Sequence, residues 1–290
     1  MSEPPIDLRA VAVAWHPRVD ESRREAQEIA KYLAQCGLSA AHASLNDAAF
    51  RQRIINHEFD LVIAIGGDGT MLRAGHLCGP SDVPLLGINM GHFGFLTEIR
   101  QEDWREPFAR LLDGDYRLEK RMMLCAEQWR GEERLGSWDV LNEVVISRGQ
   151  MVRPVHLTAQ VDGRFLATYV ADALIAATPT GSTAYSLAAG GPILPPELRN
   201  ILLVEVAPHL SIDRAIVLAE GSAVSISVHT DHQAVLSVDG QAPVKMKTGD
   251  RVEAFASEHT MRFVRFQDPG YFYRNLTPHM NQNPSTGNSR

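Results

Sequence analysis

The strongest constraint on the fold is an apolar run that ends in a glycine-rich turn. Residues 61–65 are Leu-Val-Ile-Ala-Ile, and Gly66-Gly67-Asp68-Gly69-Thr70 follows them directly. So short an apolar run is typical of a strand buried on both faces, as in a parallel sheet, and residues 9–15 and 83–89 are similar. Residues 21–36 predict a helix whose apolar face carries Ala26, Ile29, Ala30 and Leu33. This order predicts an α/β N-terminal domain with an open parallel sheet.

The pattern changes beyond residue 120, where short β-like runs are separated by glycine-containing or polar turns. These runs lie at residues 122–129, 140–146, 155–161, 174–178, 201–206, 224–228, 235–238, 252–256 and 262–266. Successive short strands with turn residues between them predict a β-rich C-terminal domain. We therefore expect an α/β domain at 1–118 and a β-rich domain at 119–267, with a tail at about 268–290 that can return to the first domain.

The composition excludes several classes of function. With 44% hydrophobic residues, the chain can bury a core without disulfide or metal staples. A formal net charge of −7, without a basic stripe, argues against a nucleic-acid partner, and no stretch approaches the ~18 apolar residues of a membrane span. The N-terminus lacks the features of a signal peptide, and Cys36, Cys78 and Cys125 lie far apart, as is typical of a reducing compartment. We expect a cytoplasmic protein with neither nucleic acid nor membrane as a partner.

The glycine-rich turn has the features of a phosphate site that also holds a carboxylate. It follows a predicted parallel strand, where open α/β sheets bind ligands, and glycine amides can surround an anion. It is not a Walker A loop, because no Gly-Lys-Ser/Thr follows, nor a GxGxxG fingerprint, because Leu72 occupies the third glycine position. An acid here is explained if Asp68 binds a metal or accepts a proton from an attacking hydroxyl; the alternative is a tight turn in which Asp68 caps a helix. The candidates for phosphate contacts are Gly66, Gly67, Gly69 and Thr70.

Two further segments place polar groups beside apolar runs. Asn142 and Glu143 lie in a run otherwise suited to burial, so they are candidates for a ligand contact; the alternative is an edge or turn pair facing water. Residues 178–186, Thr-Pro-Thr-Gly-Ser-Thr-Ala-Tyr-Ser, combine hydroxyl groups, a glycine and a tyrosine ring that can stack on a base. Here the alternative is an ordinary helix cap at Ser182 or Thr183.

The turn at 66–70 resembles the signature shared by NAD kinases, diacylglycerol and sphingosine kinases and, more distantly, phosphofructokinases. Further motifs resemble NAD kinases in particular, and lie in the family's order at residues 89–96, 119–124, 142–143, 172, 178–186, 190–193 and 237–241. Lipid kinases are not expected to carry the Asn-Glu pair or the long hydroxyl-rich segment. The resemblance implies the two-domain architecture of NAD kinases and a homodimer or homotetramer.

The resemblance also implies roles for individual residues. Asp68 corresponds to the general base that accepts the proton of the adenosine 2′-hydroxyl of NAD as this oxygen attacks the γ-phosphate of ATP, or of polyphosphate, to give NADP. A divalent metal, Mg or Mn, is implied to act through the ATP phosphates. One departure is Ala173, where family members commonly carry glycine, and His92 and Phe93 either line the pocket or form a packed crossover. The residues implied to bind NAD are Asp68, Gly69, Asn142, Glu143, Arg153, Asp172, Thr183, Ala184, Tyr185, Ser186, Leu187, Ala188 and Gln241.

Two other functions are compatible with the turn alone. A lipid or small-molecule kinase would associate with membranes or show no NAD-dependent consumption of ATP. A nucleotide-sensing module with an inactive turn would bind NAD without making product. Asp68 and the complete set of motifs favour the NAD kinase.

Overall fold

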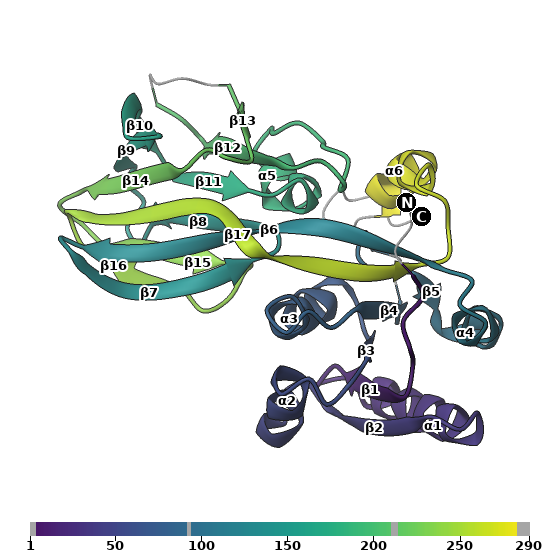
Figure 1. Cartoon of the computed structure of the whole chain (residues 1–290). Coiled ribbons are helices and arrows are strands. Elements are labelled where there is room, and N and C mark those ends of the chain that lie inside the picture. Colours follow the sequence, from purple (N-terminus) through teal and green to yellow (C-terminus); the bar gives the residue numbers. More distant parts are fainter. Residues whose placement is uncertain (1–3, 92–93, 210–213, 283–290) are drawn as a thin grey trace. The chain divides into compact units, whose positions relative to one another are not determined.

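A computed structural model describes residues 4–91, 94–209 and 214–282, and these form two compact units. The described residues of Met1–Lys120 and Met261–Arg290 form the first unit, and those of Arg121–Thr260 form the second. Two long strands, β6 (Arg117–Arg130) and β17 (Asp250–Arg265), contribute residues to both units (Figure 1). The candidates His92 and Phe93 lie outside the described residues.

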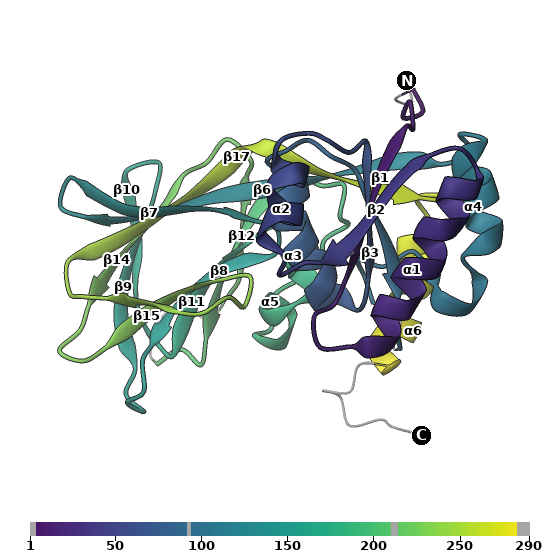
Figure 2. The ribbon, with the colours of Figure 1, turned by 90° about the horizontal axis from the view of Figure 1, so that it is seen from below.

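The first unit is an α/β domain built on a parallel sheet, as predicted. Its strands pair in the order β2-β1-β3-β4, all in parallel, and the end of β17 joins the edge of β4 in the same direction, with Phe263 beside Leu85. Figure 2 shows β1, β2 and β3 with helix α1 alongside them. The elements are β1 (Ala10–Trp15), α1 (Asp20–Gln35), β2 (Ser39–Ser44), α2 (Ala48–Ile55), β3 (Leu61–Ile65), α3 (Asp68–Cys78), β4 (Leu85–Asn89), β5 (Ile99–Arg100), η1 (Gln101–Asp103), α4 (Arg105–Leu112) and α6 (Tyr271–Gln282).

The apolar runs of the sequence form the buried core of this unit. Every residue of β3 and β4 is buried, because each strand has neighbours on both edges and helices on the faces of the sheet. Helix α1 turns the predicted apolar face onto the sheet, where Ile29 and Leu33 join a cluster with Val11 and Ile63. Strand β2 was not predicted: it is an edge strand of small, partly exposed residues, so it carries no apolar run.

The second unit consists of two antiparallel sheets, which confirms the expected β-rich fold. One contains β10, β9, β14 and β17 with β6 and β7, and the other has the order β13-β12-β11-β8-β15-β16. Residues of both sheets share one buried core, to which Leu157 and Ile226 contribute from the first sheet and Ile146 and Leu203 from the second. The further elements are β7 (Glu133–Val140), β8 (Glu143–Arg148), β9 (Val155–Val161), β10 (Arg164–Ala171), β11 (Ala173–Ala177), η2 (Thr180–Thr183), α5 (Tyr185–Ala188), β12 (Asn200–Val206), β13 (Ile216–Ala219), β14 (Val224–His229), β15 (Ala234–Val238) and β16 (Val244–Met246).

Candidate active site

The turn after β3 brings the backbone of Gly66 against Thr70. Gly66 has a φ of +156°, and a Cβ atom there would lie 2.2 Å from Thr70 Oγ1, so only glycine fits. Its N–H donates to the Ile88 carbonyl of β4 at 2.9 Å, and the Thr70 N–H donates to the Gly67 carbonyl as α3 begins. Gly69 is exposed in the first turn of α3. The turn therefore presents a helix N-terminus at the end of a parallel strand, where the helix dipole favours phosphate.

The carboxylate of Asp68 is held by the backbone of a later segment. Its Oδ2 accepts a hydrogen bond from the Phe95 N–H at 2.9 Å, and its Oδ1 accepts one from the Leu96 N–H at 3.0 Å. Gly94 lies against this group, since a Cβ atom at Gly94 would be 2.1 Å from Asp68 Oδ1. Helix α3 has Gly67 as its N-cap without a side-chain capping bond, so Asp68 does not cap its own helix. Each carboxylate oxygen retains acceptor capacity for a hydroxyl proton or a metal.

Residues 178–186 fold onto the start of β8. The Thr178 N–H donates to the Asn142 carbonyl at 2.8 Å, and its Oγ1 donates to the Leu141 carbonyl at 2.6 Å. Gly181 approaches so closely that a Cβ atom there would be 2.2 Å from the Asn142 oxygen. The structure therefore brings together the Asn-Glu pair and the hydroxyl-rich segment, which were separate motifs in the sequence.

Ser182 and Thr183 are not helix caps, so that alternative is wrong. The N-cap of α5 is Ala184, which makes no side-chain capping bond. Ser182 Oγ donates to the Pro179 carbonyl at 2.6 Å and accepts the Leu194 N–H at 2.9 Å, while Thr183 Oγ1 bonds within η2. Ser182 thus ties the hydroxyl-rich segment to the loop that follows it.

A second carboxylate, Asp239, holds the backbone at the start of β8. It accepts the N–H groups of Leu141, Asn142 and Glu143 at 2.7, 2.8 and 2.9 Å. Because these groups bond to Asp239, the single strand expected at 140–146 is wrong, and β7 ends before β8 begins. No role was predicted for Asp239; the feature that could have indicated one is an Asp-Gly turn after a strand, with φ of 47° and 68° at Asp239 and Gly240.

Three buried polar atoms of this region have no hydrogen-bond partner among the described residues. They are Glu143 Oε2, Thr180 Oγ1 and Ser186 Oγ. Asn142 and Glu143 are only 8% and 7% exposed, so the alternative of a pair facing water is wrong. Buried polar atoms are normally paired, and unpaired ones on β8, η2 and α5 fit a ligand that supplies their partners.

The environment of Glu143 favours its neutral form. Burial raises the pKa of Glu143 to about 8, and the charge of Asp239 adds to the rise, although the Tyr185 N–H donates to this carboxylate and lowers it. A protonated carboxyl group can donate as well as accept, so Glu143 can bond to an acceptor on a ligand.

Glu143→Gln is expected to stabilise the protein at high pH. The pKa of Glu143 in the folded protein, about 8, lies above the ordinary 4.5. The neutral carboxyl group therefore makes a contribution to stability that is fully present below pH 4.5 and is lost as the pH rises through 8. The amide does not ionise, so the gain in free energy of unfolding grows from about 1 kcal/mol at about pH 5 to on the order of 5 kcal/mol at about pH 9. Urea unfolding of both proteins measures it, and a gain that does not change with pH would contradict the assignment.

Asp172 lies away from the Asn-Glu pair. It precedes β11, whose other end, Ala177, pairs with Glu143. The strand therefore separates Asp172 from the pair, and Asp172 Oδ1 accepts a hydrogen bond from Arg148 Nε at 2.8 Å. Neighbouring Ala173 is buried within β11 in extended conformation, so its methyl group is accommodated without backbone strain.

The other predicted contacts lie on α5 and at the surface, and they stay predictions. Arg153 and Gln241 are exposed, and both follow strands of the second unit. On and beside α5, Tyr185 and Ala188 are exposed, whereas Ala184 and Leu187 are partly buried. In the part of the chain that the structure describes, no helix is long and apolar enough to cross a membrane.

Comparisons of the sequence with known proteins identify the same family as the motifs. Residues 12–116 match the ATP-NAD kinase N-terminal domain, and residues 141–266 match the ATP-NAD kinase C-terminal domain. An NAD kinase of Chloroflexus aurantiacus is 36% identical over 269 residues, 93% of this chain and 97% of that protein. One of Geotalea daltonii is 39% identical over 255 residues, 85% of this chain and 89% of that protein.

Solved structures share the fold. A crystal structure of yeast NADH kinase complexed with NADH superposes with a TM-score of 0.83 at 23% identity, covering 97% of this chain and 89% of that chain. An NAD kinase from Archaeoglobus fulgidus in complex with ATP gives 0.76 at 23% identity, over 94% and 99% of the two chains. Both domain matches, the extent of the sequence identity and the shared architecture lead to one conclusion: the chain belongs to the NAD kinase family.

Proposed function

We propose that this protein transfers the γ-phosphate of ATP to the 2′-hydroxyl of the adenosine ribose of NAD and so produces NADP. The observation that carries the proposal is the Asp68 carboxylate, fixed by two backbone N–H groups beside a glycine-rich turn. The family membership supports the same acceptor, because relatives at 36% and 39% identity are NAD kinases.

The proposed role of Asp68 is that of a general base. Phosphoryl transfer depends mainly on alignment and on neutralising charge. As the ribose oxygen bonds to the γ-phosphorus, the bond from that phosphorus to the β–γ bridging oxygen breaks and ADP leaves. The hydroxyl proton passes to Asp68, whose oxygens each accept only one backbone N–H in the described structure.

The acceptor is proposed to bind at the unpaired polar atoms of the second unit. Glu143, Thr180 and Ser186 supply buried groups that need partners, and a dinucleotide carries ring nitrogens, hydroxyls and phosphates that provide them. The predicted contacts at Asn142, Gln241 and on α5 are proposed for the same part of the ligand, and Asp172, at the other end of β11, is proposed for a part of the dinucleotide farther from Glu143.

We propose that the phosphate donor and its metal ion bind at the turn after β3. Of the predicted contacts Gly66, Gly67, Gly69 and Thr70, we propose that Gly67 and Gly69 face the phosphates of ATP, or of a polyphosphate in its place, because the N–H groups of Gly66 and Thr70 already bond to carbonyls. Among the described residues no cluster of three or more His, Cys, Asp or Glu side chains could hold a metal ion. The chemistry of these residues therefore fits a Mg or Mn ion that is bound chiefly by the substrate phosphates and neutralises their charge.

The cellular setting is likewise a proposal. Cys36, Cys78 and Cys125 are all free, which fits a reducing compartment such as the cytoplasm. The family resemblance supports a homodimer or homotetramer, which light scattering of the purified protein measures directly.

A coupled assay tests the function. The pure protein is incubated with NAD, ATP and MgCl2, and NADP is read with an NADP-specific dehydrogenase. We expect one ADP for each NADP formed, and no ADP above background when NAD is omitted. Consumption of ATP without NADP, or binding of NAD without product, would contradict the proposal and favour another kinase or a sensor.

A further inference from the structure

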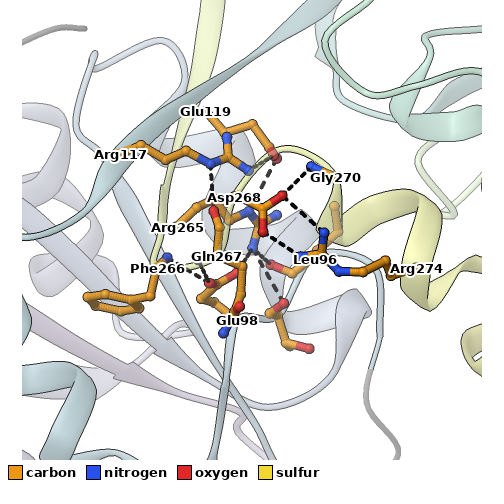
Figure 3. A network of polar contacts seen from close by, with 11 residues as sticks. Leu96, Glu98, Arg117, Glu119, Arg265, Phe266, Gln267, Asp268, Gly270 and Arg274 are labelled. Carbon is orange, nitrogen blue, oxygen red and sulfur yellow. Dashed lines mark hydrogen bonds and ion pairs between the residues drawn. The ribbon is translucent and has the colours of Figure 1, made fainter.

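We infer that the buried Arg265 is a positioning residue for Asp68 and that it acts through the backbone of Leu96. Figure 3 shows Arg265 among Leu96, Glu98 and Glu119, with Arg117 and the residues that follow β17 around them. The inference rests on the proposed role of Asp68, since it assigns a residue that keeps this carboxylate in place. Asp68, Leu96 and Arg265 all belong to the first unit.

The link consists of two consecutive hydrogen bonds through one peptide segment. Arg265 Nη1 donates to the Leu96 carbonyl at 3.2 Å, and the Leu96 N–H donates to Asp68 Oδ1 at 3.0 Å. The adjacent Phe95 N–H donates to Asp68 Oδ2 at 2.9 Å. Two N–H groups of the segment at residues 95–96 therefore fix the Asp68 carboxylate, and Arg265 bonds to a carbonyl of the same segment.

This segment has little regular structure to fix it. Residues 94–98 belong to no helix or strand, and β5 begins only at Ile99. Besides Arg265 and Asp68, this segment is restrained by the Glu98 N–H, which donates to the Gly87 carbonyl at 2.9 Å, by the Gly94 N–H, which donates to Thr97 Oγ1 at 3.2 Å, and by the side chains of Glu98 and Phe95. Arg265 Nη1 reaches two consecutive carbonyls of this segment, Leu96 at 3.2 Å and Thr97 at 3.4 Å, and so helps to place the N–H groups at 95 and 96.

Arg265 is itself fixed by two buried carboxylates. Its Nε donates to Glu119 Oε1 at 3.2 Å and its Nη1 to Glu98 Oε2 at 3.3 Å, and all three side chains are at most 5% exposed. Glu98 Oε1 also accepts the N–H groups of Phe266 and Gln267, at 2.7 and 3.2 Å. The planar guanidinium thus reaches two carboxylates and two backbone carbonyls at once, which an ammonium group cannot do in the same geometry.

Arg265→Lys separates positioning from a purely structural role. We expect kcat to fall by about 10- to 100-fold, because small displacements of a reacting group have effects of this size, while KM for NAD changes by less than about 2-fold. Amide hydrogen exchange at residues 95 and 96 is expected to accelerate. The matched control is Arg130→Lys, which removes the guanidinium that bonds to Asp250 at 2.8 and 2.9 Å in the other unit. Arg130→Lys should keep kcat within about 2-fold of that of the unsubstituted protein.

The decisive measurement repeats Arg265→Lys in an Asp68→Asn background. If Arg265 acts through Asp68, its substitution causes no further fall in kcat there, because coupled residues are not additive. An equal fall in both backgrounds, or no fall in either, overturns the inference while leaving the proposed function intact. Full activity of Asp68→Asn alone would instead overturn the role of Asp68.

A milder variant guards against misfolding of Arg265→Lys. Glu119→Gln keeps the shape of the side chain but removes one of the two charges that hold the guanidinium. We expect a kcat several-fold lower in the presence of Asp68 and unchanged in the Asp68→Asn background. A Glu119→Gln protein with normal kcat and normal amide exchange at residues 95 and 96 also overturns the inference.

Discussion

Asp68→Asn is expected to lower kcat by roughly 10²- to 10⁴-fold while leaving the dissociation constant for NAD within a few-fold, since this is the usual contribution of a general base. The amide has the size of the carboxylate but cannot accept the ribose proton. It also faces the Phe95 and Leu96 N–H groups, only one of which its single oxygen can satisfy. Steady-state production of NADP gives kcat, and calorimetric titration gives the affinity for NAD.

Asp47→Asn is the matched control for this substitution. Asp47 caps α2 by accepting the Phe50 N–H at 2.9 Å, and asparagine is an equally good N-cap. The control protein should therefore keep both its stability and its kcat. Turnover of Asp68→Asn close to that of the control would mean that another group takes the proton.

Gly94→Ala is expected to reduce kcat by about 100-fold with little change in melting temperature, since a displacement of about 1 Å at a reacting group has an effect of this size. The new Cβ atom would lie 2.1 Å from Asp68 Oδ1 and 2.6 Å from Oδ2, far inside contact distance. The group in its way is the end of a flexible side chain, so the carboxylate can rotate aside and the backbone need not move. Such a rotation gives up the bonds to the Phe95 and Leu96 N–H groups. Turnover and thermal unfolding on the same preparation separate the two effects.

Gly221→Ala controls for the glycine substitution itself. A Cβ atom at this exposed glycine would meet nothing within 4 Å, so activity and stability should stay as they are. If Gly94→Ala melts far below this control, the segment rather than the carboxylate has moved. If it keeps full activity, the position of Asp68 does not limit the reaction.

The regular parts of the fold could be predicted because burial leaves a direct trace in the sequence. Strands β3 and β4 are buried throughout and appear as continuous apolar runs, and α1 shows its buried face at the helical period. Elements at edges leave a weaker trace. Strand β7 (Glu133–Val140) is largely exposed and charged at its start, and β10 begins with exposed residues, so neither was predicted.

The residues of the candidate site could be predicted from motifs, whereas the residues that hold its backbone in place could not. Asp68, Asn142 and Glu143 could be chosen because an acid in a glycine turn, or polar groups in an apolar run, need a chemical reason. Asp239 and Arg265 act through the backbone of residues distant in sequence, at separations of 96 and 169 residues in the bonds to Glu143 and Leu96. Side-chain bonds to a distant backbone leave no periodicity in the chain, so only the fold reveals them.

The three hydrogen bonds of Asp239 also affect the entropic cost of binding NAD. They immobilise the peptide groups of residues 141–143 during folding, when the entropy of that short segment is lost. A nucleotide arriving at Asn142 and Glu143 finds a preorganised surface and does not bear that entropic cost again. Under the proposed function, affinity at this place reflects the side-chain contacts themselves, and the loop contributes by having been ordered beforehand.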